Sequence, residues 1–303
     1  MAKIVGIGAN VFDTLYNIPT YPTEDTKMRA TACKTAGGGP CATGLVAAAK
    51  LGESAAYIGN FSDDNGGKFL KADFEKYGVS TEHTRVLSGY HSFTSVLWLC
   101  ADSATRTCVF DKGDLPPLVL DEAQKKAIRD AEILMVDGNE LDAAIEGAKI
   151  AKQSGTKVLY DCGGLYPNVE KLLSLCDIMI PSEEFALGHT GCKSAQDAAK
   201  KLFETYRPEV VVITQGKNGG LLYDGHDTVR YPIYPAEVVD SNGSGDVFHG
   251  AFAAAVVKGY SFLACCHFSS AVSAIKCTKV GSRESVPDFA TAKEYLKENG
   301  YEL

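Results

Sequence analysis

Residues 240–250 read DSNGSGDVFHG, and small apolar residues from Ala251 to Val257 follow them. This apolar run has the composition of a helix packed against a sheet, so the glycine-rich turn stands at a helix start. Backbone N–H groups exposed in such a turn bind anions. Asp246 beside them suits phosphoryl transfer, in which a carboxylate takes a proton from an attacking hydroxyl group. A plain helix cap is the alternative role for this aspartate.

The overall composition narrows the class of protein. The chain has 303 residues, 45% of them hydrophobic, and a formal net charge of -8 without a dense Lys/Arg cluster. A nucleic-acid partner is not expected, because such proteins present a basic face. The start MAKIVGIGANVFD lacks a long apolar stretch, and no window approaches about 18 uninterrupted apolar residues. We therefore predict a cytoplasmic protein with no membrane partner.

The cysteines support the same compartment. The chain has ten of them, none in a CxxC pair. Several lie in apolar runs, so we expect buried, unpaired thiols in a reducing environment.

Short apolar runs alternate with helical patterns along most of the chain. We expect strands at residues 3–8, 55–59, 133–136, 157–160, 178–180 and 210–213, and the end of a strand at Val238–Val239. Helical spacing or alanine-rich composition predicts helices at residues 40–51, 65–77, 140–153 and 168–175. This alternation is typical of a mainly parallel sheet with helices on both faces. We therefore predict a single α/β domain over residues 1–303.

Two stretches interrupt the alternation. Residues 14–35 contain prolines and little helix signal, and residues 91–110 read as two strands joined by residues 101–104. We predict that these pieces form a small antiparallel sheet inserted in the α/β domain, as a lid over the site.

Motifs of two other nucleotide-binding classes are missing. The chain contains no GxxxxGK[ST], which excludes a P-loop kinase. Gly6-x-Gly8 is followed by Val11 in place of a third glycine, so a dinucleotide-dependent oxidoreductase is not expected.

Five segments in order resemble the ribokinase-like (PfkB) carbohydrate kinases, whose second signature is written D-T-x-G-A-G-D. The segments are IGANVFD at 7–13, GGGPCATGLVAAAKLG at 37–52, VVVITQGKNGGLL at 210–222, DSNGSGDVFHGAF at 240–252 and KCTKVGSRESVP at 276–287. The resemblance implies a ribokinase-like three-layer sandwich with a small β lid. It also implies an ATP-dependent carbohydrate kinase and, through the lid, a homodimer.

The resemblance assigns roles to individual residues. Asp246 is the expected base, and the turn before it is the expected anion hole for the transferred phosphoryl group, formed by Gly243, Ser244 and Gly245. The expected sugar contacts are Asp13, Gly38, Gly39 and Thr43. The expected ATP contacts are Thr214, Gly216 and, near adenine, Ser270.

The metal positions follow the family pattern less closely. The N-x-x-E motif that organises Mg²⁺-bound water aligns with Ser182-Glu-Glu-Phe185, so Glu183 or Glu184 would have to substitute. The resemblance places a monovalent cation such as K⁺ at Asp240 and carbonyls near Gly281 and Ser285. Thr43 and His249 each stand at a position where the family commonly has asparagine. The chemistry requires no catalytic role for His249, because the aspartate is sufficient.

The substrate is less specified than the reaction. Several segments resemble the sulfofructose kinase branch, which also suggests a ketohexokinase-like enzyme. Asn139 stands where that branch has an arginine, and a sulfonate group needs strong cationic donors. We therefore expect an ordinary ketohexose or a related sugar. A nucleoside kinase on the same fold and a catalytically silent sugar-binding protein are the alternatives.

Overall fold

A nine-stranded sheet forms the centre of the molecule in the computed structural model, which describes residues 1–103, 105–164 and 167–303. Its strand order is β15-β14-β13-β12-β11-β10-β1-β4-β6. The strands in chain order are β1 (Ile4–Ile7), β4 (Ala55–Tyr57), β6 (Val79–Ser80), β10 (Ile133–Val136), β11 (Lys157–Cys162), β12 (Ile178–Pro181), β13 (Val210–Thr214), β14 (Gly220–Tyr223) and β15 (Thr228–Tyr231). Neighbours pair in parallel from β6 to β13, and only β14 and β15 are antiparallel within this described sheet.

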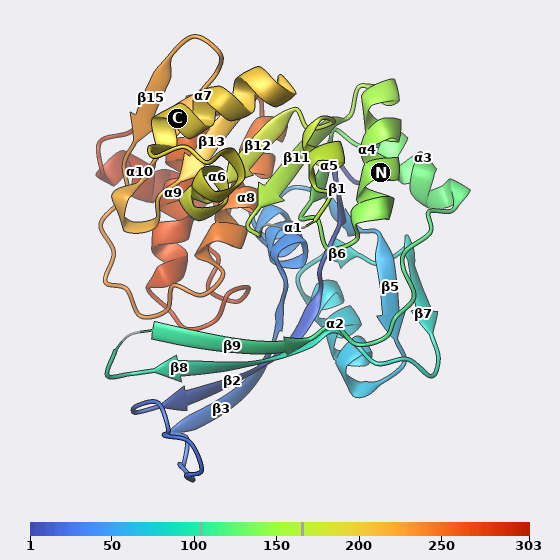
Figure 1. The fold of residues 1–303 in the computed structure, drawn as a ribbon, viewed down its shortest axis with the longest axis vertical. Coiled ribbons are helices and arrows are strands. Elements are labelled where there is room, and N and C mark those ends of the chain that lie inside the picture. The colour runs from blue at the N-terminus through green and yellow to red at the C-terminus, as the bar shows by residue number, and fades with distance from the viewer. Residues whose placement is uncertain (104, 165–166) are drawn as a thin grey trace.

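Helices cover both faces of this sheet, and each face has its own apolar core (Figure 1). One core includes side chains of α1 (Pro40–Lys50), α2 (Asn65–Lys76), α8 (Ser244–Val257), α9 (Phe262–Cys277) and α10 (Phe289–Glu298). The other includes side chains of α3 (Glu122–Asp130), α4 (Leu141–Ser154), α5 (Glu170–Leu173), α6 (Glu183–Thr190) and α7 (Ala195–Tyr206). The predicted three-layer α/β sandwich is confirmed.

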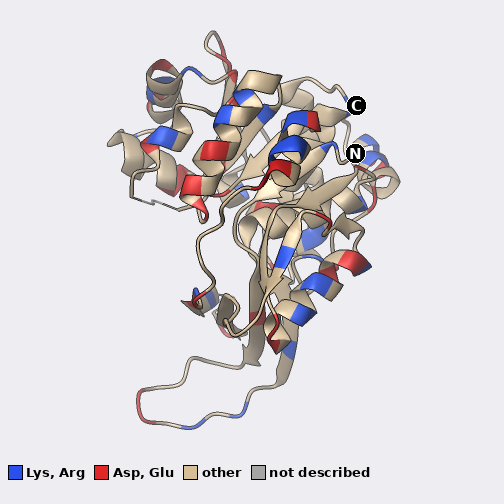
Figure 2. Ribbon diagram, turned by 90° about the vertical axis from the view of Figure 1, so that its right-hand side faces the viewer, with Lys and Arg blue, Asp and Glu red and all other residues tan. Residues whose placement is uncertain are grey.

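A second, smaller sheet lies beside this body in Figure 1, with strand order β3-β2-β8-β9. Its strands are β2 (Val11–Ile18), β3 (Ala32–Gly38), β8 (Thr94–Cys100) and β9 (Thr105–Asp111). These strands overlap the predicted segments 14–35 and 91–110, although Ala104 in the predicted connection lies outside the described residues. In Figure 2 the loop between β2 and β3 projects away from the helices.

The prediction that this small sheet is antiparallel is wrong at its centre. β2 pairs with β3 and β8 pairs with β9 in antiparallel fashion, but β2 and β8 run parallel. Parallel neighbours need a long connection, and the chain between β3 and β8 supplies it through α1, β4 and α2.

Two further local predictions need correction. Val238 and Val239 lie outside any strand and are 63% and 59% exposed. Their β-branched side chains predicted a strand, but the N–H groups of Val239 and Asp240 donate to the Cys277 carbonyl after α9, away from the sheet. The predicted helix at 168–175 contracts to α5, Glu170–Leu173, because turns at Leu175 and Cys176 lead back into β12.

The prediction of buried, unpaired cysteines is confirmed for most of them and wrong for two on the small sheet. All ten thiols are free; seven are buried, Cys192 is partly exposed, and Cys33 and Cys108 are exposed on β3 and β9. Within the described chain, no helix combines the length and the apolar character that crossing a bilayer requires.

Candidate active site

The site lies where parallel strands of the main sheet end, and it combines predicted and unpredicted side chains. Asp137 directly follows β10, Asp161 lies near the end of β11, and Thr214 ends β13. In open α/β sheets ligands bind outside these carboxyl ends. Helix α8 reaches the same edge, because His249 Nε2 lies 2.9 Å from the Ile180 carbonyl of β12.

Two glycines bring the start of α1 against the start of α8. A Cβ atom at Gly250 would lie 2.0 Å from the Gly44 carbonyl oxygen, so only hydrogen atoms fit between the two backbones. A Cβ atom at Gly44 would in turn lie 3.4 Å from the Asp246 carbonyl oxygen. The close crossing therefore places the predicted sugar-binding glycines near the predicted base.

The glycine-rich turn forms the start of α8 as predicted. Gly243 is the N-cap residue with φ +74°, a conformation that glycine adopts easily, and no side chain caps the helix. A Cβ at Gly245 would meet no atom within 4 Å, so this side of the turn is open. The first N–H groups of a helix lack intrahelical acceptors, and the open turn can present them to an anion.

Asp246 lies in the first turn of α8 and is partly exposed. Loss of water around the carboxyl raises its pKa, and the neighbouring charge of Asp137 raises it further. The positive charges of His249, Arg106 and Lys276 act in the opposite direction. Arg106 belongs to β9, so the small sheet contributes charge to this site.

His249 stands one turn behind Asp246 and contacts three oxygen atoms. Its Nδ1 lies 2.6 Å from the Gly245 carbonyl and 3.2 Å from Asp161 Oδ2, and its Nε2 lies 2.9 Å from the Ile180 carbonyl. Both nitrogens can donate to these carbonyls only in the doubly protonated ring. Burial raises the pKa of the Asp161 carboxyl, and His249 opposes that rise. The sequence prediction missed Asp161, which no motif marks.

On the predicted sugar side, Asp13 packs closely against Gly38. Asp13 is 7% exposed and its Oδ1 accepts a hydrogen bond from the Ser95 hydroxyl of β8 at 2.6 Å. A Cβ at Gly38 would lie 1.9 Å from Asp13 Oδ2, and Gly39 has φ +93°. Burial raises the pKa of Asp13 to about 6, with Ser95 and Arg283 opposing the rise and Asp246 adding to it.

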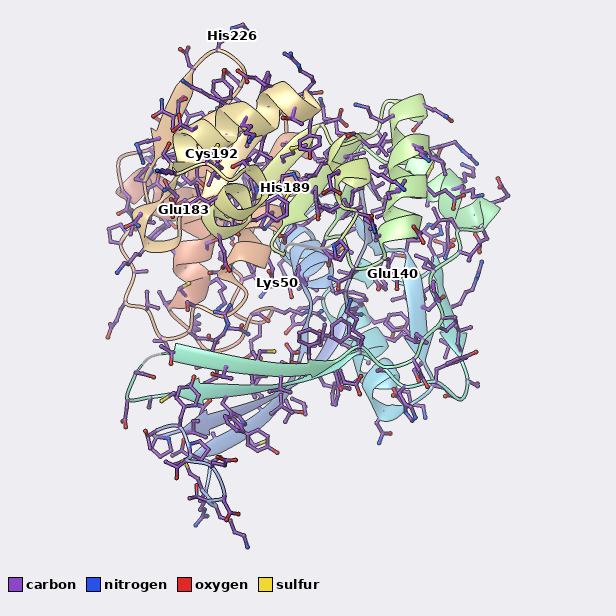
Figure 3. The ribbon with its side chains drawn as sticks, viewed as in Figure 1. Lys50, Glu140, Glu183, His189, Cys192 and His226 are labelled. Carbon is purple, nitrogen blue, oxygen red and sulfur yellow. The ribbon has the colours of Figure 1, made fainter. Side chains whose placement is uncertain are left out.

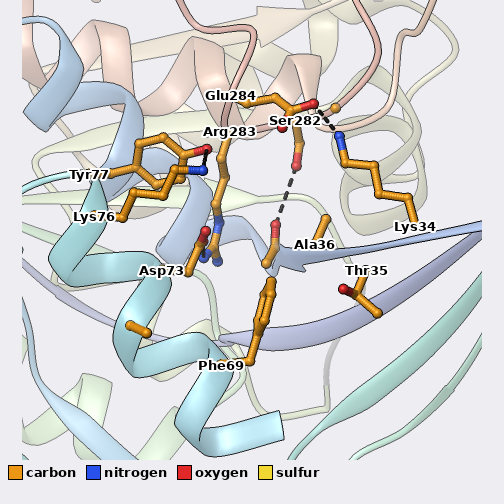
Figure 4. A pocket seen from close by; sticks show the side chains of 13 residues that line it. Lys34, Thr35, Ala36, Phe69, Asp73, Lys76, Tyr77, Ser282, Arg283 and Glu284 are labelled. Atoms are coloured by element: carbon orange, nitrogen blue, oxygen red, sulfur yellow. Dashed lines mark hydrogen bonds and ion pairs between the residues drawn. The ribbon is translucent and has the colours of Figure 1, made fainter.

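Arg283 organises this pair and was also missed by sequence reasoning. Its Nη2 donates to the Gly38 carbonyl at 2.6 Å and to Asn10 Oδ1 at 3.0 Å. Its Nη1 donates to Asp73 Oδ2 at 2.7 Å, and Figure 4 shows these two side chains together. Its Nε lies 3.5 Å from the hydroxyl of Thr43, which is fully buried. Thr43 thus reaches the sugar side through this buried guanidinium.

The predicted nucleotide residues are more dispersed. Thr214 ends β13 next to Ser182, and Gly216 starts a short 3-10 helix (Gly216–Asn218) with φ +53° and open space around its hypothetical Cβ. The hydroxyl of Ser270 on α9 donates to the Pro232 carbonyl at 2.7 Å. Ser270 therefore serves a structural contact in the structure, and its role near adenine stays a prediction.

Ser182 and Phe185, which align with the two ends of N-x-x-E, provide neither an amide nor a carboxylate for a metal. Ser182 caps α6 by accepting the Phe185 N–H, and the Phe185 ring is buried against His189. Glu183, on α6 in Figure 3, accepts a hydrogen bond from Gln215 Nε2 at 2.7 Å. Across the described residues, no group of three or more His, Cys, Asp or Glu side chains is arranged to hold a metal ion.

A cavity of about 490 Å³ adjoins the sugar side. Asn10, which accepts from Arg283, lines it together with Asn60 and Glu140. The buried amide nitrogen of Asn10 and amide oxygen of Asn60 have no hydrogen-bond partner in the structure. Such groups are costly when buried alone, so they point to a polar ligand or water.

Comparisons with known proteins point to one family. Residues 1–288 match the pfkB family carbohydrate kinase profile. A ribokinase of Haemophilus influenzae is 27% identical over 299 residues, covering 96% of this chain and 97% of the relative. A 5-dehydro-2-deoxygluconokinase of Shouchella clausii is 26% identical over 319 residues, covering 97% and 95%.

A solved structure shares the whole fold. The structure of Arabidopsis thaliana ribokinase complexed with ribose and ATP superposes with a TM-score of 0.87 at 26% identity, covering 98% of this chain and 99% of the other.

Proposed function

Because this chain belongs to the pfkB family of carbohydrate kinases, we propose that it transfers the γ-phosphoryl group of Mg-ATP to a hydroxyl group of a ketohexose or a related sugar. One observation carries the proposal. Asp246 follows the open Gly243–Gly245 turn, and its charge acts on Asp13 across the crossing of α1 and α8. A similar ribokinase that was solved with ribose and ATP supports both substrate classes.

In the proposed reaction Asp246 removes the proton from the attacking sugar hydroxyl. Its raised pKa increases its strength as a base, and the neighbouring His249 opposes that rise. Backbone donors of Gly243, Ser244 and Gly245 stabilise charge on the transferred phosphoryl group, aided by the positive end of the α8 dipole.

The remaining sugar hydroxyls bind opposite this turn. We propose that Asp13 accepts hydrogen bonds from them, and that Gly38 and Gly39 let the ring approach the backbone. Arg283 and Thr43 hold that backbone in place, as the contact between Arg283 and the Gly38 carbonyl supports.

The adjoining cavity supports a neutral polyhydroxyl substrate. Its unpartnered Asn10 and Asn60 amides suit hydroxyl groups, which both donate and accept hydrogen bonds. Lys112 is the basic side chain among the residues that line it, and Asn139 also lines it. A sulfonate would favour a guanidinium here, so we propose an unsulfonated ketohexose.

The nucleotide side completes the proposal. Thr214 and Gly216 are proposed to contact ATP phosphates, with Ser270 near adenine. Mg²⁺ would bind mainly through phosphate oxygens and water. Glu183 is the proposed carboxylate for that water, because it accepts a hydrogen bond from Gln215, which lies between Thr214 and Gly216. We derive no reaction step through this metal.

The small sheet has the surface expected of a dimer interface. Val109 and Phe110 of β9 are 67% and 60% exposed, and Trp98 of β8 is 37% exposed. We propose that a second copy covers these apolar side chains, in a cytoplasmic homodimer.

The function is tested by ADP release from Mg-ATP over a panel of ketoses, aldoses, sugar acids, sulfofructose and nucleosides. We expect sugar-dependent release that is fastest with a ketohexose, and a sugar phosphate in the product. Faster turnover of a nucleoside would favour a nucleoside kinase. Sugar binding measured by calorimetry without any phosphorylation would favour a silent binding protein, and both results contradict the proposal.

A further inference from the structure

Lys276 is a fully buried lysine beside the proposed anion site. It lies in the last turn of α9 and is 0% exposed. Its ammonium group donates to the Asp240 carbonyl at 2.7 Å and lies 4.0 Å from Asp240 Oδ2. A buried charge is unfavourable unless it is paired and hydrogen-bonded, and Asp240 supplies both partners.

Asp240, whose oxygens lie beside the Lys276 ammonium group, is one of the residues predicted to bind a monovalent cation. Asp240 Oδ2 accepts the Gly281 N–H at 2.9 Å, and Asp240 Oδ1 accepts the Asn242 N–H at 2.8 Å. The Ser285 hydroxyl donates to the Gly281 carbonyl. The predicted ligands are therefore bonded to one another, and the ammonium group occupies a position at the Asp240 carbonyl.

Lys276 is also placed to act on the turn before Asp246. Its positive charge lowers the pKa of Asp246. One turn earlier on α9, the Ser273 hydroxyl donates to the Ser244 carbonyl at 3.0 Å. The same helix therefore holds both the first turn of α8 and the Asp240 end of the loop that precedes it.

We propose that the Lys276 ammonium group takes the place of a monovalent cation, so that phosphoryl transfer by this protein needs no K⁺. Lys276 is a positioning residue in this account, because it acts through Asp240 and the turn that follows. The inference rests on the proposed function, in which the Gly243–Gly245 turn binds the phosphoryl group.

The first test uses the wild-type protein. Sugar-dependent ADP release is measured with KCl replaced stepwise by choline chloride at constant ionic strength. We expect the rate to change by less than about twofold, because a built-in charge needs no added ion. Activation by K⁺ of about tenfold or more would overturn the inference. Absence of turnover with every sugar would count against the proposed function instead.

A second readout does not depend on activity. The thermal unfolding temperature of the wild type is compared in KCl and choline chloride at equal ionic strength. Equal temperatures are expected, since no K⁺ binds. A K⁺-specific increase that saturates with concentration would overturn the inference even if no substrate were known.

Variants separate charge from packing. Lys276→Met keeps most of the volume and removes the charge, so kcat should fall about tenfold or more, with no recovery in KCl. Lys276→Ala opens space, and KCl or methylammonium chloride should restore part of its activity. Lys279→Ala is the matched control, because Lys279 is exposed three residues further on, and it should behave as wild type.

Each variant outcome is decisive. Full activity of Lys276→Met in choline chloride would overturn the inference, as would equal recovery of the Met and Ala variants in KCl. If Lys276→Ala does not fold, the Met variant and the wild-type salt comparison still decide.

Discussion

The two sides of the candidate site are built in different ways. On the sugar side, Asp13, Gly38 and Arg283 contact one another in a buried cluster, and Asp246 lies close enough for its charge to act on Asp13. On the nucleotide side, Thr214 ends β13, and Gly216 starts a short 3-10 helix with open space around its hypothetical Cβ. The comparison teaches that tight packing fixes the positions of the base and of the sugar-binding side chains. On the nucleotide side, much of the binding geometry depends on the ligand itself.

The sugar side should respond most strongly to loss of a single charge. We expect Asp13→Asn to lower kcat/KM for the sugar about a hundredfold, mainly through KM, because a charged acceptor becomes neutral. KM for ATP should change little. Steady-state kinetics with each substrate varied in turn check this. Equal losses for both substrates would contradict the distinction between the two sides.

The same variant should gain stability near neutral pH. The pKa of Asp13 is raised from 3.8 to about 6 in the folded protein. The folded state therefore holds an extra proton between these values, and stability falls as pH rises through this window. Asp13→Asn should raise the unfolding temperature at pH 7.5, with the gain disappearing at about pH 4. A loss at both pH values would contradict this reading.

The close crossing of α1 and α8 should tolerate no added atom. Gly250→Ala places a Cβ 2.0 Å from the Gly44 carbonyl oxygen, so the free energy of unfolding should fall by about 1–3 kcal/mol. Denaturant titration measures the change. Gly147→Ala in α4 is the control, since its nearest neighbours are movable side-chain atoms at 3.1 Å or more. Similar losses in both variants would contradict the special role of the crossing.

Removing the charge behind the base should shift the pH profile. His249 lowers the pKa of Asp246, so in His249→Gln that pKa should rise. The acid limb of kcat/KM should then move to higher pH by about half a unit to one unit. The control is His267→Gln. His267 lies on α9 and is hydrogen-bonded to Tyr234, so its substitution should leave the acid limb in place. An unmoved limb in His249→Gln would show that the imidazole is only structural.

The nucleotide side should give the smallest effect. Glu183→Gln is expected to raise the Mg²⁺ concentration for half-maximal rate about two- to fivefold, because one carboxylate near bound water is lost. Glu184→Gln, an exposed neighbour, should have no effect. A hundredfold loss of kcat/KM in Glu183→Gln would equal the loss expected for Asp13→Asn and would contradict the difference between the two sides.

What the sequence could predict depended on how close the partners lie along the chain. Gly243 to Asp246 form one local turn, so their arrangement followed from residue types alone. Arg283 binds the Gly38 carbonyl 245 positions away. Asp161 on β11 contacts His249 on α8. Such contacts depend on the strand order, which local patterns do not encode.

Features that the local sequence pattern did not reveal have a related cause. Val238 and Val239 have strand composition, yet the N–H groups of Val239 and Asp240 donate to the Cys277 carbonyl at the end of α9. The cation site at Asp240, Gly281 and Ser285 stays a prediction, but the sequence did not mark Lys276, whose buried ammonium group is found only once α9 is packed against the loop. In both cases tertiary contacts override a correct local pattern.

The central claim is that Asp246 is the base of a sugar kinase, and one measurement tests it most directly. Sugar-dependent ADP release by Asp246→Asn is compared with wild type, on the sugar that the panel identifies. We predict a loss in kcat of about a thousandfold or more, with sugar binding by calorimetry and the unfolding temperature nearly unchanged. A variant that keeps its rate within tenfold of wild type would contradict the account.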